Sequence, residues 1–522
     1  MRADAETHGE VGWQELPRRS LAASAVKSLA IVVPVVGGLV RFLMSQDWSP
    51  GGMVAAGAGA AALVVAGVLL YDAARLRATR WRLTAERLEL RTGVAVRQHR
   101  SIPRDRVRSV DLRADPVSRV FGLTLVKVGT GEHAGDGTEL TLDPLPRRQA
   151  EALRRRLLAG DAAPAHRDEP RPEAALAELR WSWIRLAPLS VWTFTGAAAV
   201  LGLAYKGLDV LGAEVFAKET ALGVWGWVTA NPWLAVPLIL IANAAVGMLG
   251  AGLLFAESWG RYRLEREPGR LRLRRGLLTS RSLTLEVRRL RGVEISRPLL
   301  LRLGGGARVK AVATGLGKAA EGETEDVAAL TPPVPLAVAE QVAAAVAALA
   351  PSRHPVVEGV PGMGGAPLRA HPPAARRRRI VRALGWVAAL AVAAAVTALL
   401  VPWLSGWAWL VPAATLPVAC WLAVAGYRGL GHALGRRHLV TGTGATVRRT
   451  VALERAGIVG WTISQSYFQR RSGLLTVTAT TAAGSGHYSV LDVGHDDGLD
   501  LAARAVPGLL EPFLVRGEQR AA

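Results

Sequence analysis

Cysteine is nearly missing from this 522-residue sequence. The single one, Cys420, lies within an apolar stretch, so disulfides and cysteine–metal sites are excluded. Lysine is scarce as well: only six of the 64 basic residues are lysines, and the other 58 are arginines. Abundant arginine, alanine and glycine are typical of a GC-rich genome. An arginine at any one surface position is therefore weak evidence of function.

The sequence also lacks the motifs that carry enzymatic chemistry. It contains no His-Glu-x-x-His and no Gly-x-Ser-x-Gly. Residues 315–318 (Gly-Leu-Gly-Lys) are close to a phosphate-binding loop, but Val312 and Ala319 stand where that loop has glycine and Ser or Thr. Asp496 and Asp497 with the nearby His495 are compatible with a metal site, although an exposed loop before the last helix is the favoured interpretation. We expect no enzymatic activity, no cofactor and no metal.

What the chain has in abundance is long apolar runs. Half of its residues are hydrophobic and its mean hydropathy is +0.23, whereas its net charge of +22 lies almost entirely between the runs. A helix needs about 20 apolar residues to cross the hydrocarbon layer. Six spans are predicted, at residues 21–44, 52–74, 184–205, 222–255, 380–403 and 407–427. The fourth is longer than needed, which indicates a tilted helix or an interfacial start.

The spans pair into three hairpins whose orientation follows from the basic residues. The short connections 45–51 and 404–406 contain no Lys or Arg. Arginines instead gather at the other ends, for example at residues 75–82 and 376–379. Because basic residues are enriched on the cytoplasmic side, both termini and all the soluble segments are predicted to be cytoplasmic.

One sequence pattern follows each hairpin, with a period of roughly 180 residues. Arg-Trp-Arg-Leu at 80–83 returns as Arg-Tyr-Arg-Leu at 261–264 and more loosely as Arg-His-Leu at 437–439. Leu-Glu-Leu-Arg-Thr-Gly at 88–93 likewise returns as Leu-Arg-Leu-Arg-Arg-Gly at 271–276. Leucines alternating with charged residues are typical of half-buried strands. Each copy ends in a helical stretch, at 147–158, 336–349 and 498–510.

This periodicity predicts the organisation of the whole chain. Two polar, proline-rich stretches separate a domain from the next hairpin and read as linkers. The predicted segments are an N-terminal tail (1–20), hairpin 1 (21–79), copy 1 (80–160), a linker (161–180), hairpin 2 (181–258), copy 2 (259–350), a linker (351–375), hairpin 3 (376–435) and copy 3 (436–516).

These blocks resemble a known family. Ile-Pro-x-x-Arg-Val-x-Ser-Val at 102–110 and Gly-Leu-x-x-Val at 122–126 are similar to the bacterial pleckstrin-homology-like domain of YdbS/YdbT-type membrane proteins. Copy 3 departs from the pattern, since it lacks Ile-Pro and has Trp461 and Tyr467 where the others carry charged or small residues. The resemblance implies transmembrane α-helical hairpins combined with three pleckstrin-homology-like β-sandwich domains, each ending in an α-helix, and no established enzymatic activity.

The strongest remaining functional signal is basic charge. Residues 259–318 contain 16 basic and 4 acidic residues. Side chains alternate along a strand, so Arg270, Arg272 and Arg274 are expected on one face, followed by Arg275. These four arginines are the candidate lipid- or anion-binding residues, attracted to the negative inner leaflet. A positive-inside bias without any ligand explains the same charges. Nucleic acid is not expected, because no aromatic stacking platform accompanies them.

We therefore expect a non-enzymatic membrane scaffold at the bacterial plasma membrane. Its partners would be membrane lipids, other proteins or further copies of itself in a homo-oligomer. The alternative is a channel or transporter component built from three hairpin repeats. That reading requires polar groups at mid-membrane, and no carboxylate stands near the middle of a predicted span.

Overall fold

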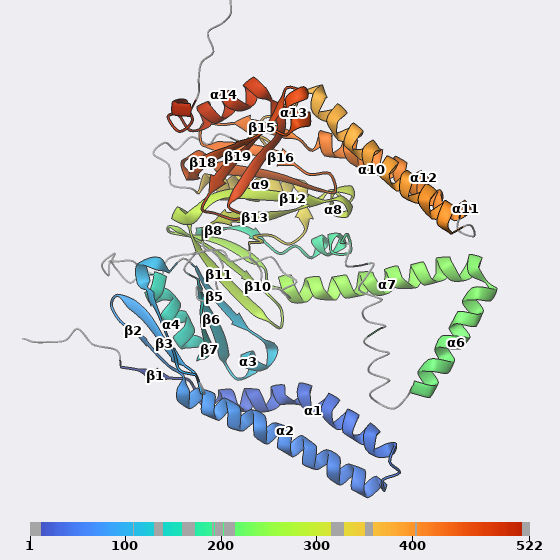
Figure 1. Cartoon of the computed structure of the whole chain (residues 1–522). Coiled ribbons are helices and arrows are strands. Elements are labelled where there is room, and N and C mark those ends of the chain that lie inside the picture. Colours follow the sequence, from blue (N-terminus) through green and yellow to red (C-terminus); the bar gives the residue numbers. More distant parts are fainter. Residues whose placement is uncertain are drawn as a thin grey trace, which may run out of the picture. The chain divides into compact units, whose positions relative to one another are not determined.

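Long apolar helices and antiparallel sheets make up the computed structural model of this chain (Figure 1). It describes residues 12–94, 96–107, 109–129, 139–158, 173–190, 193, 202, 214–314, 328–349, 359–401 and 405–513. The chain divides into two compact units, Met1–Leu285 and Glu286–Ala522. Copy 2 of the repeat is thereby shared between the units, since its first strands belong to one and its later strands to the other.

Among the described residues, five helices are long and apolar enough to cross a membrane. They are α1 (Ser20–Met44), α2 (Pro50–Ala78), α7 (Pro232–Trp259), α10 (Pro373–Leu400) and α12 (Leu410–Arg428). Helices α2, α7 and α10 each begin at a proline, whose missing N–H would find no partner in the first turn anyway. Helices α1 and α2 lie side by side as hairpin 1, and α10 and α12 form hairpin 3 with the short α11 (Ser405–Ala408) between them (Figure 1).

Hairpin 2 differs from the prediction. The expected third span, 184–205, lies mostly outside the described residues. The fourth, expected as one run over 222–255, is wrong as a single helix: α6 (Glu214–Ala230) ends and α7 begins at Pro232. Asn231 between them has φ −131° and ψ 57°. A proline ring clashes with a helical conformation of the residue before it, so Pro232 causes the break.

Two antiparallel sheets form the soluble part of the first unit. One has the order β1-β2-β3-β4 and the other β7-β6-β5-β11-β10-β9-β8. The strands are β1 (Gln14–Glu15), β2 (Arg80–Leu83), β3 (Arg87–Thr92), β4 (Gln98–Pro103), β5 (Ser109–Ala114), β6 (Leu123–Gly129), β7 (Glu139–Pro146), β8 (Glu173–Glu178), β9 (Arg263–Glu267), β10 (Arg270–Arg275) and β11 (Ser280–Glu286). Helices α3 (Pro116–Val120) and α4 (Arg147–Leu158) accompany them.

The second unit also contains two antiparallel sheets, ordered β14-β13-β12-β17-β16-β15 and β18-β19-β20. The strands are β12 (Leu290–Pro298), β13 (Gly306–Ala313), β14 (Val334–Pro335), β15 (Gly431–Leu434), β16 (His438–Thr443), β17 (Val447–Glu454), β18 (Ile458–Ser464), β19 (Leu474–Thr481) and β20 (His487–Gly494). Its shorter helices are α8 (Leu299–Leu303), α9 (Leu336–Ala348), α13 (Tyr467–Arg471) and α14 (His495–Ala505).

The alternation read from the sequence matches the core of copy 1. Leu88 and Leu90 on β3 are buried together with Val126 on β6, Leu142 on β7 and Leu153 on α4. Fully burying one such leucine contributes about 1.5–3 kcal/mol. Copy 1 therefore builds its core from one face of its strands and closes it with the helix that follows, as the period-two pattern indicates.

The segments expected as a tail and as linkers contain strand pairings. Gln14 of β1 pairs with Trp81, Ala177 of β8 pairs with Leu264, and Arg369 bridges to His432. The segment just before each hairpin thus pairs with the first strand after that hairpin. For β8 (Glu-Ala-Ala-Leu-Ala-Glu) local propensity favours a helix. Pairing with the edge of β9 decides the conformation instead.

Candidate functional site: the junctions between hairpins and domains

A buried carboxylate holds hairpin 3 to copy 3. Asp492 lies near the end of β20, beside the register shift between Leu475 and Val477 on the neighbouring strand. Its φ is +56°, a left-handed conformation that aspartate and asparagine tolerate better than most residues. Its side chain is only 3% exposed. A carboxylate buried to this degree needs charged or hydrogen-bonding partners.

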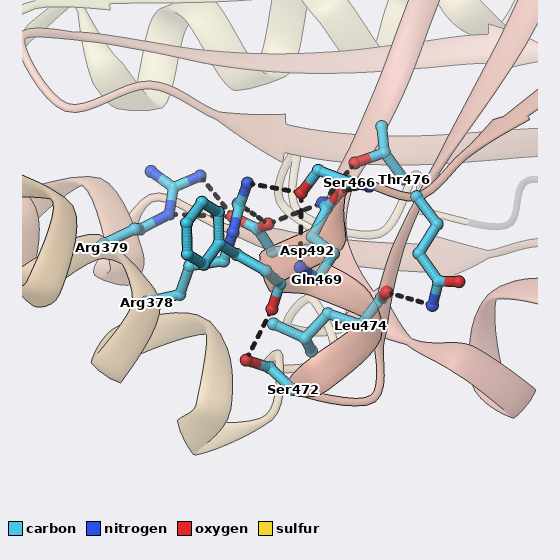
Figure 2. A network of polar contacts seen from close by, with 10 residues as sticks. Arg378, Arg379, Ser466, Gln469, Ser472, Leu474, Thr476 and Asp492 are labelled. Atoms are coloured by element: carbon cyan, nitrogen blue, oxygen red, sulfur yellow. Dashed lines mark hydrogen bonds and ion pairs between the residues drawn. The ribbon is translucent and has the colours of Figure 1, made fainter.

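Asp492 finds these partners on two helices, as Figure 2 shows. From α10, Arg378 donates to Oδ1, and Arg379 donates through Nε to Oδ2 at 3.3 Å. From α13, the Gln469 amide donates to Oδ1 at 3.0 Å. Gln469 is itself fixed, because its side chain and that of Ser466 form a reciprocal cap at the start of α13. Three donors on two helices therefore converge on one acid.

The four arginines at 376–379 divide into two pairs. Arg378 and Arg379 are half-buried on Asp492, whereas Arg376 and Arg377 are exposed. Successive residues on a helix point about 100° apart, so a run of four reaches both the domain and the solvent. Removing one member of a buried ion pair costs about 3–5 kcal/mol. The start of α10 is thereby locked to the domain that follows it.

Two buried histidines lie beside this junction. The Nε2 of His371 lies 3.1 Å from the Nδ1 of His432, and the Tyr427 hydroxyl donates to the His371 carbonyl. Burial, and then the charge of His371, lower the pKa of His432 to about 4. Burial also lowers the pKa of His371 and brings that of His438 on β16 to about 4. The folded second unit therefore holds these rings neutral.

This arrangement predicts acid sensitivity. Because the folded pKa of His432 lies below the unfolded value of 6.5, its contribution to stability is complete above pH 6.5 and is lost as the pH falls to about 4. The loss is roughly 2–3 kcal/mol for His432 at that pH. Thermal unfolding of the full chain in detergent, measured from pH 7 to pH 4, should show a shallower loss for His432→Asn. The exposed His487→Asn is the control, and equal slopes for all three proteins would contradict the assignment.

Hairpin 1 is tied to copy 1 by the same kind of contact. Lys27 on α1 donates to Asp115 at 2.7 Å and to the Ser118 hydroxyl at 3.1 Å. Burial alone would raise the pKa of Asp115, but the hydrogen bonds that its carboxylate accepts from Lys27 and Ser118 hold it below its usual value. Arg75 on α2 donates to the Asp143 carbonyl at 2.9 Å. Both helices of the hairpin thus contact the domain through a cation.

Hairpin 2 uses an acid on the helix and an arginine on the sheet. Glu257 near the end of α7 accepts from the backbone N–H of Leu278 at 3.0 Å and of Thr279 at 2.7 Å. The guanidinium of Arg275 lies over the ring of Trp259, 4.3 Å from its centre. Each hairpin with described residues is therefore fastened to the strands that follow it.

The arginines expected to bind anions are placed differently from one another. Arg272 forms an ion pair with Glu267 at 3.1 Å and is largely buried, and Arg275 is 4% exposed, with its guanidinium over the Trp259 ring. Arg270 is half-buried and Arg274 is exposed. Strand alternation does put Arg270, Arg272 and Arg274 on one face, opposite Arg275. Headgroup binding by these residues stays a prediction, and Arg274 is the best exposed of them.

Helix α4 covers part of that face. Arg154 on α4 is buried and donates to the Thr284 hydroxyl of β11 at 3.1 Å. Burial, and then the charge of Arg272, lower its pKa to about 10. Such packing was invisible in the sequence, because α4 and β10 are more than a hundred residues apart. In the described part of the chain, no group of three or more His, Cys, Asp or Glu side chains is arranged to hold a metal ion.

Sequence reasoning missed Asp492, although one signal was present. A single acid within the apolar run Val490–Val493 indicates a carboxylate with a partner. The arginines at 376–379 were interpreted only as charges that set the orientation of hairpin 3 in the membrane. Which of them reach Asp492 depends on the rotational phase of α10 and on the register shift between β19 and β20.

Comparison with known proteins agrees with this architecture. The family model of the bacterial PH domain matches residues 28–160, 217–349 and 380–507, more than half of the chain. The chain belongs to the bacterial PH domain family. No curated protein and no solved structure matches it. Each match to the bacterial PH domain spans hairpin residues together with the strands and helix that follow, so helices and domain recur as one unit.

Proposed function

We propose that this bacterial PH domain protein is a non-enzymatic scaffold at the inner face of the plasma membrane. Its hairpins anchor the soluble domains, and the domains dock on anionic lipid or on protein partners. Both termini and all soluble segments lie on the cytoplasmic side. The proposal rests on the membrane-type helices and the triple bacterial PH domain match together with the junction contacts.

The observation that carries the proposal is the contact of Arg378 and Arg379 with buried Asp492. A flexible tether would leave a domain free to turn away from the membrane. A helix start locked to the domain by a desolvated ion pair fixes the face that the domain presents. This rigidity suits a docking platform.

Exposed charge at the same junction supports lipid docking. Arg376 and Arg377 continue the helix start toward solvent with no acid paired to either among the described residues. A basic residue close to an anionic leaflet gains about 1 kcal/mol. Two adjacent guanidinium groups on an anchored helix meet the headgroups without any further ordering of the domain.

We expect the double variant Arg376→Gln, Arg377→Gln to retain less anionic lipid. The full chain would be extracted from vesicles containing phosphatidylglycerol and phosphatidylcholine, and bound lipid counted by native mass spectrometry. A loss of about 2 kcal/mol in summed attraction corresponds to a many-fold drop in bound phosphatidylglycerol. Arg148→Gln, Arg155→Gln on exposed positions of α4 is the charge-matched control. Equal lipid retention by both double variants would remove lipid docking at this junction.

A further inference from the structure

Neighbouring copies of the repeat are joined by strand pairing. In the first unit β5 of copy 1 pairs antiparallel with β11 of copy 2, and in the second unit β12 of copy 2 pairs antiparallel with β17 of copy 3. We call these pairings the first and second seam. Each seam merges strands from two copies into one continuous sheet.

The two seams have the same register. A short helical turn follows the equivalent strand of each copy, at Arg104–Arg106, Val287–Arg289 and Arg455–Gly457, and aligns the copies. By this alignment Val110 corresponds to Val293, and Thr284 corresponds to Ala452. Val110 pairs with Thr284 in the first seam, and Val293 pairs with Ala452 in the second. The pairing is therefore a repeated feature of the molecule.

An arginine on the short helix after the seam strand repeats as well. Arg119 on α3 donates to the carbonyl of Leu277 at 2.6 Å, and its equivalent Arg302 on α8 donates to the carbonyl of Ala445 at 3.4 Å. Both carbonyls belong to the turn between two strands of the next copy. Gly276 and Gly444 adopt positive φ values of 103° and 100° in these turns.

A crossed ion pair is the third repeated contact. Asp111 on β5 lies 3.1 Å from Arg281 on β11, and the equivalent Glu294 on β12 lies 3.7 Å from Arg449 on β17. Each seam thus combines strand pairing, an acid–arginine contact and an arginine on the partner's turn.

The corresponding strands at the two ends of the array have one free edge each. In the part of the chain that the structure describes, β4 pairs only with β3 and β18 pairs only with β19. Strand β18 (Ile-Val-Gly-Trp-Thr-Ile-Ser) contains no charge and no proline, and Val459 is 68% exposed. Proteins normally protect free edges with lysine, proline or a covering segment. An edge without such protection is a template for another strand.

The two free edges carry residues that correspond to those making the seam contacts. Arg470 on α13 corresponds to Arg119 and Arg302, and its exposed side chain has no partner among the described residues. Its expected acceptor turn in copy 1 keeps the positive φ at Gly93, 120°. The acid and arginine of the crossed pair are replaced together, by Thr462 and Gln98, so neither member of that pair is left without the other.

We propose that β18 of one molecule pairs antiparallel with β4 of a second molecule of this chain, in the register of the seams, giving a head-to-tail assembly. The seam register places Trp461 opposite Ser101, Thr462 opposite Arg100 and Ile463 opposite His99. Arg470 then donates to the carbonyl of Val94 in the neighbouring molecule. The interface is heterologous, so each added molecule again offers a free β18 and a free β4.

Disulfide trapping tests this register directly. Paired residues on antiparallel strands have Cα atoms about 4.5 or 5.5 Å apart, within the range of a disulfide. In a Cys420→Ala background, full chains carrying Ile463→Cys and His99→Cys would be mixed in detergent and oxidised. We expect a covalent dimer from the mixture and a ladder of higher oligomers from the chain that carries both cysteines. Ile463→Cys with Arg100→Cys, whose side chain lies on the opposite face, should crosslink far less.

Three results would overturn the proposal. One is a dimer of Ile463→Cys with itself, which requires symmetric pairing of two β18 strands. Another is a disulfide within a single molecule of the double variant. The third is no crosslink at all. Arg470→Ala should lower the crosslink yield about five-fold or more, since a hydrogen bond to a charged group is lost. Arg471→Ala is the neighbouring control and should leave the yield unchanged.

Discussion

Replacing Asp492 by asparagine should release hairpin 3 from copy 3. The amide has nearly the shape of the carboxylate and tolerates the positive φ at this position, so the backbone is undisturbed. What disappears is the charge that faces Arg378 and Arg379. Two guanidinium groups are then held together at a half-buried site without a counter-charge. The expected loss is about 3 kcal/mol or more in the free energy of unfolding.

Two measurements follow this change in the full chain. Thermal unfolding in detergent reports the loss of stability. Trypsin reports the junction itself, because it cleaves after arginine and the run 376–379 offers four sites at the start of α10. Cleavage there should become faster in Asp492→Asn, since the helix start spends more time away from the domain.

The exposed Asp496 supplies the control. It contacts only His495, at 3.1 Å, in the described structure, so Asp496→Asn should leave both the melting temperature and the cleavage rate unchanged. Adding Arg378→Gln and Arg379→Gln to Asp492→Asn should recover part of the loss, because the unpaired charges are removed as well. If Asp492→Asn melts and is cleaved like the wild type, the ion pair does not hold the junction.

Local features of this fold were readable from the sequence. The alternation at Leu88 and Leu90 predicted a half-buried strand, and α4 begins and ends at the expected residues, Arg147 and Leu158. The apolar runs of hairpins 1 and 3 also became helices. Each of these features depends on neighbours in the chain, so period and composition are sufficient to find it.

The seams were out of reach because their partners are remote in the chain. Ser282 and Leu112 pair although they lie 170 positions apart, and the sequence of neither strand identifies the other as its partner. Arginine roles were equally hidden. Arg274 is exposed and Arg275 is buried over Trp259, although both are adjacent members of one basic run. A charge count measures how many cations a surface has, whereas the fold decides which of them remain free.

Substitution of Gly292, at the second seam, should have the second large effect on stability. This glycine lies on β12 opposite Leu453, and a Cβ added there would lie 2.3 Å from the carbonyl oxygen of Ala452 on β17. That oxygen belongs to the backbone of the paired strand, so relief requires the two strands to separate. Gly292→Val should therefore destabilise the second unit by about 2–3 kcal/mol.

The equivalent glycine in copy 3 provides a control for the close approach at Gly292. Gly460 on β18 corresponds to Gly292, but a Cβ there would meet nothing within 4 Å. Valine also suits a strand better than glycine does, so Gly460→Val should leave the melting temperature of the monomeric chain unchanged or raise it slightly. Copy 1 has Ser109 at this position, which means that the close approach belongs to the second seam. Equal melting temperatures for the Gly292 and Gly460 variants would show that β12 and β17 are not paired in solution. A loss confined to Gly292→Val would show that the seam contributes to the stability of the fold.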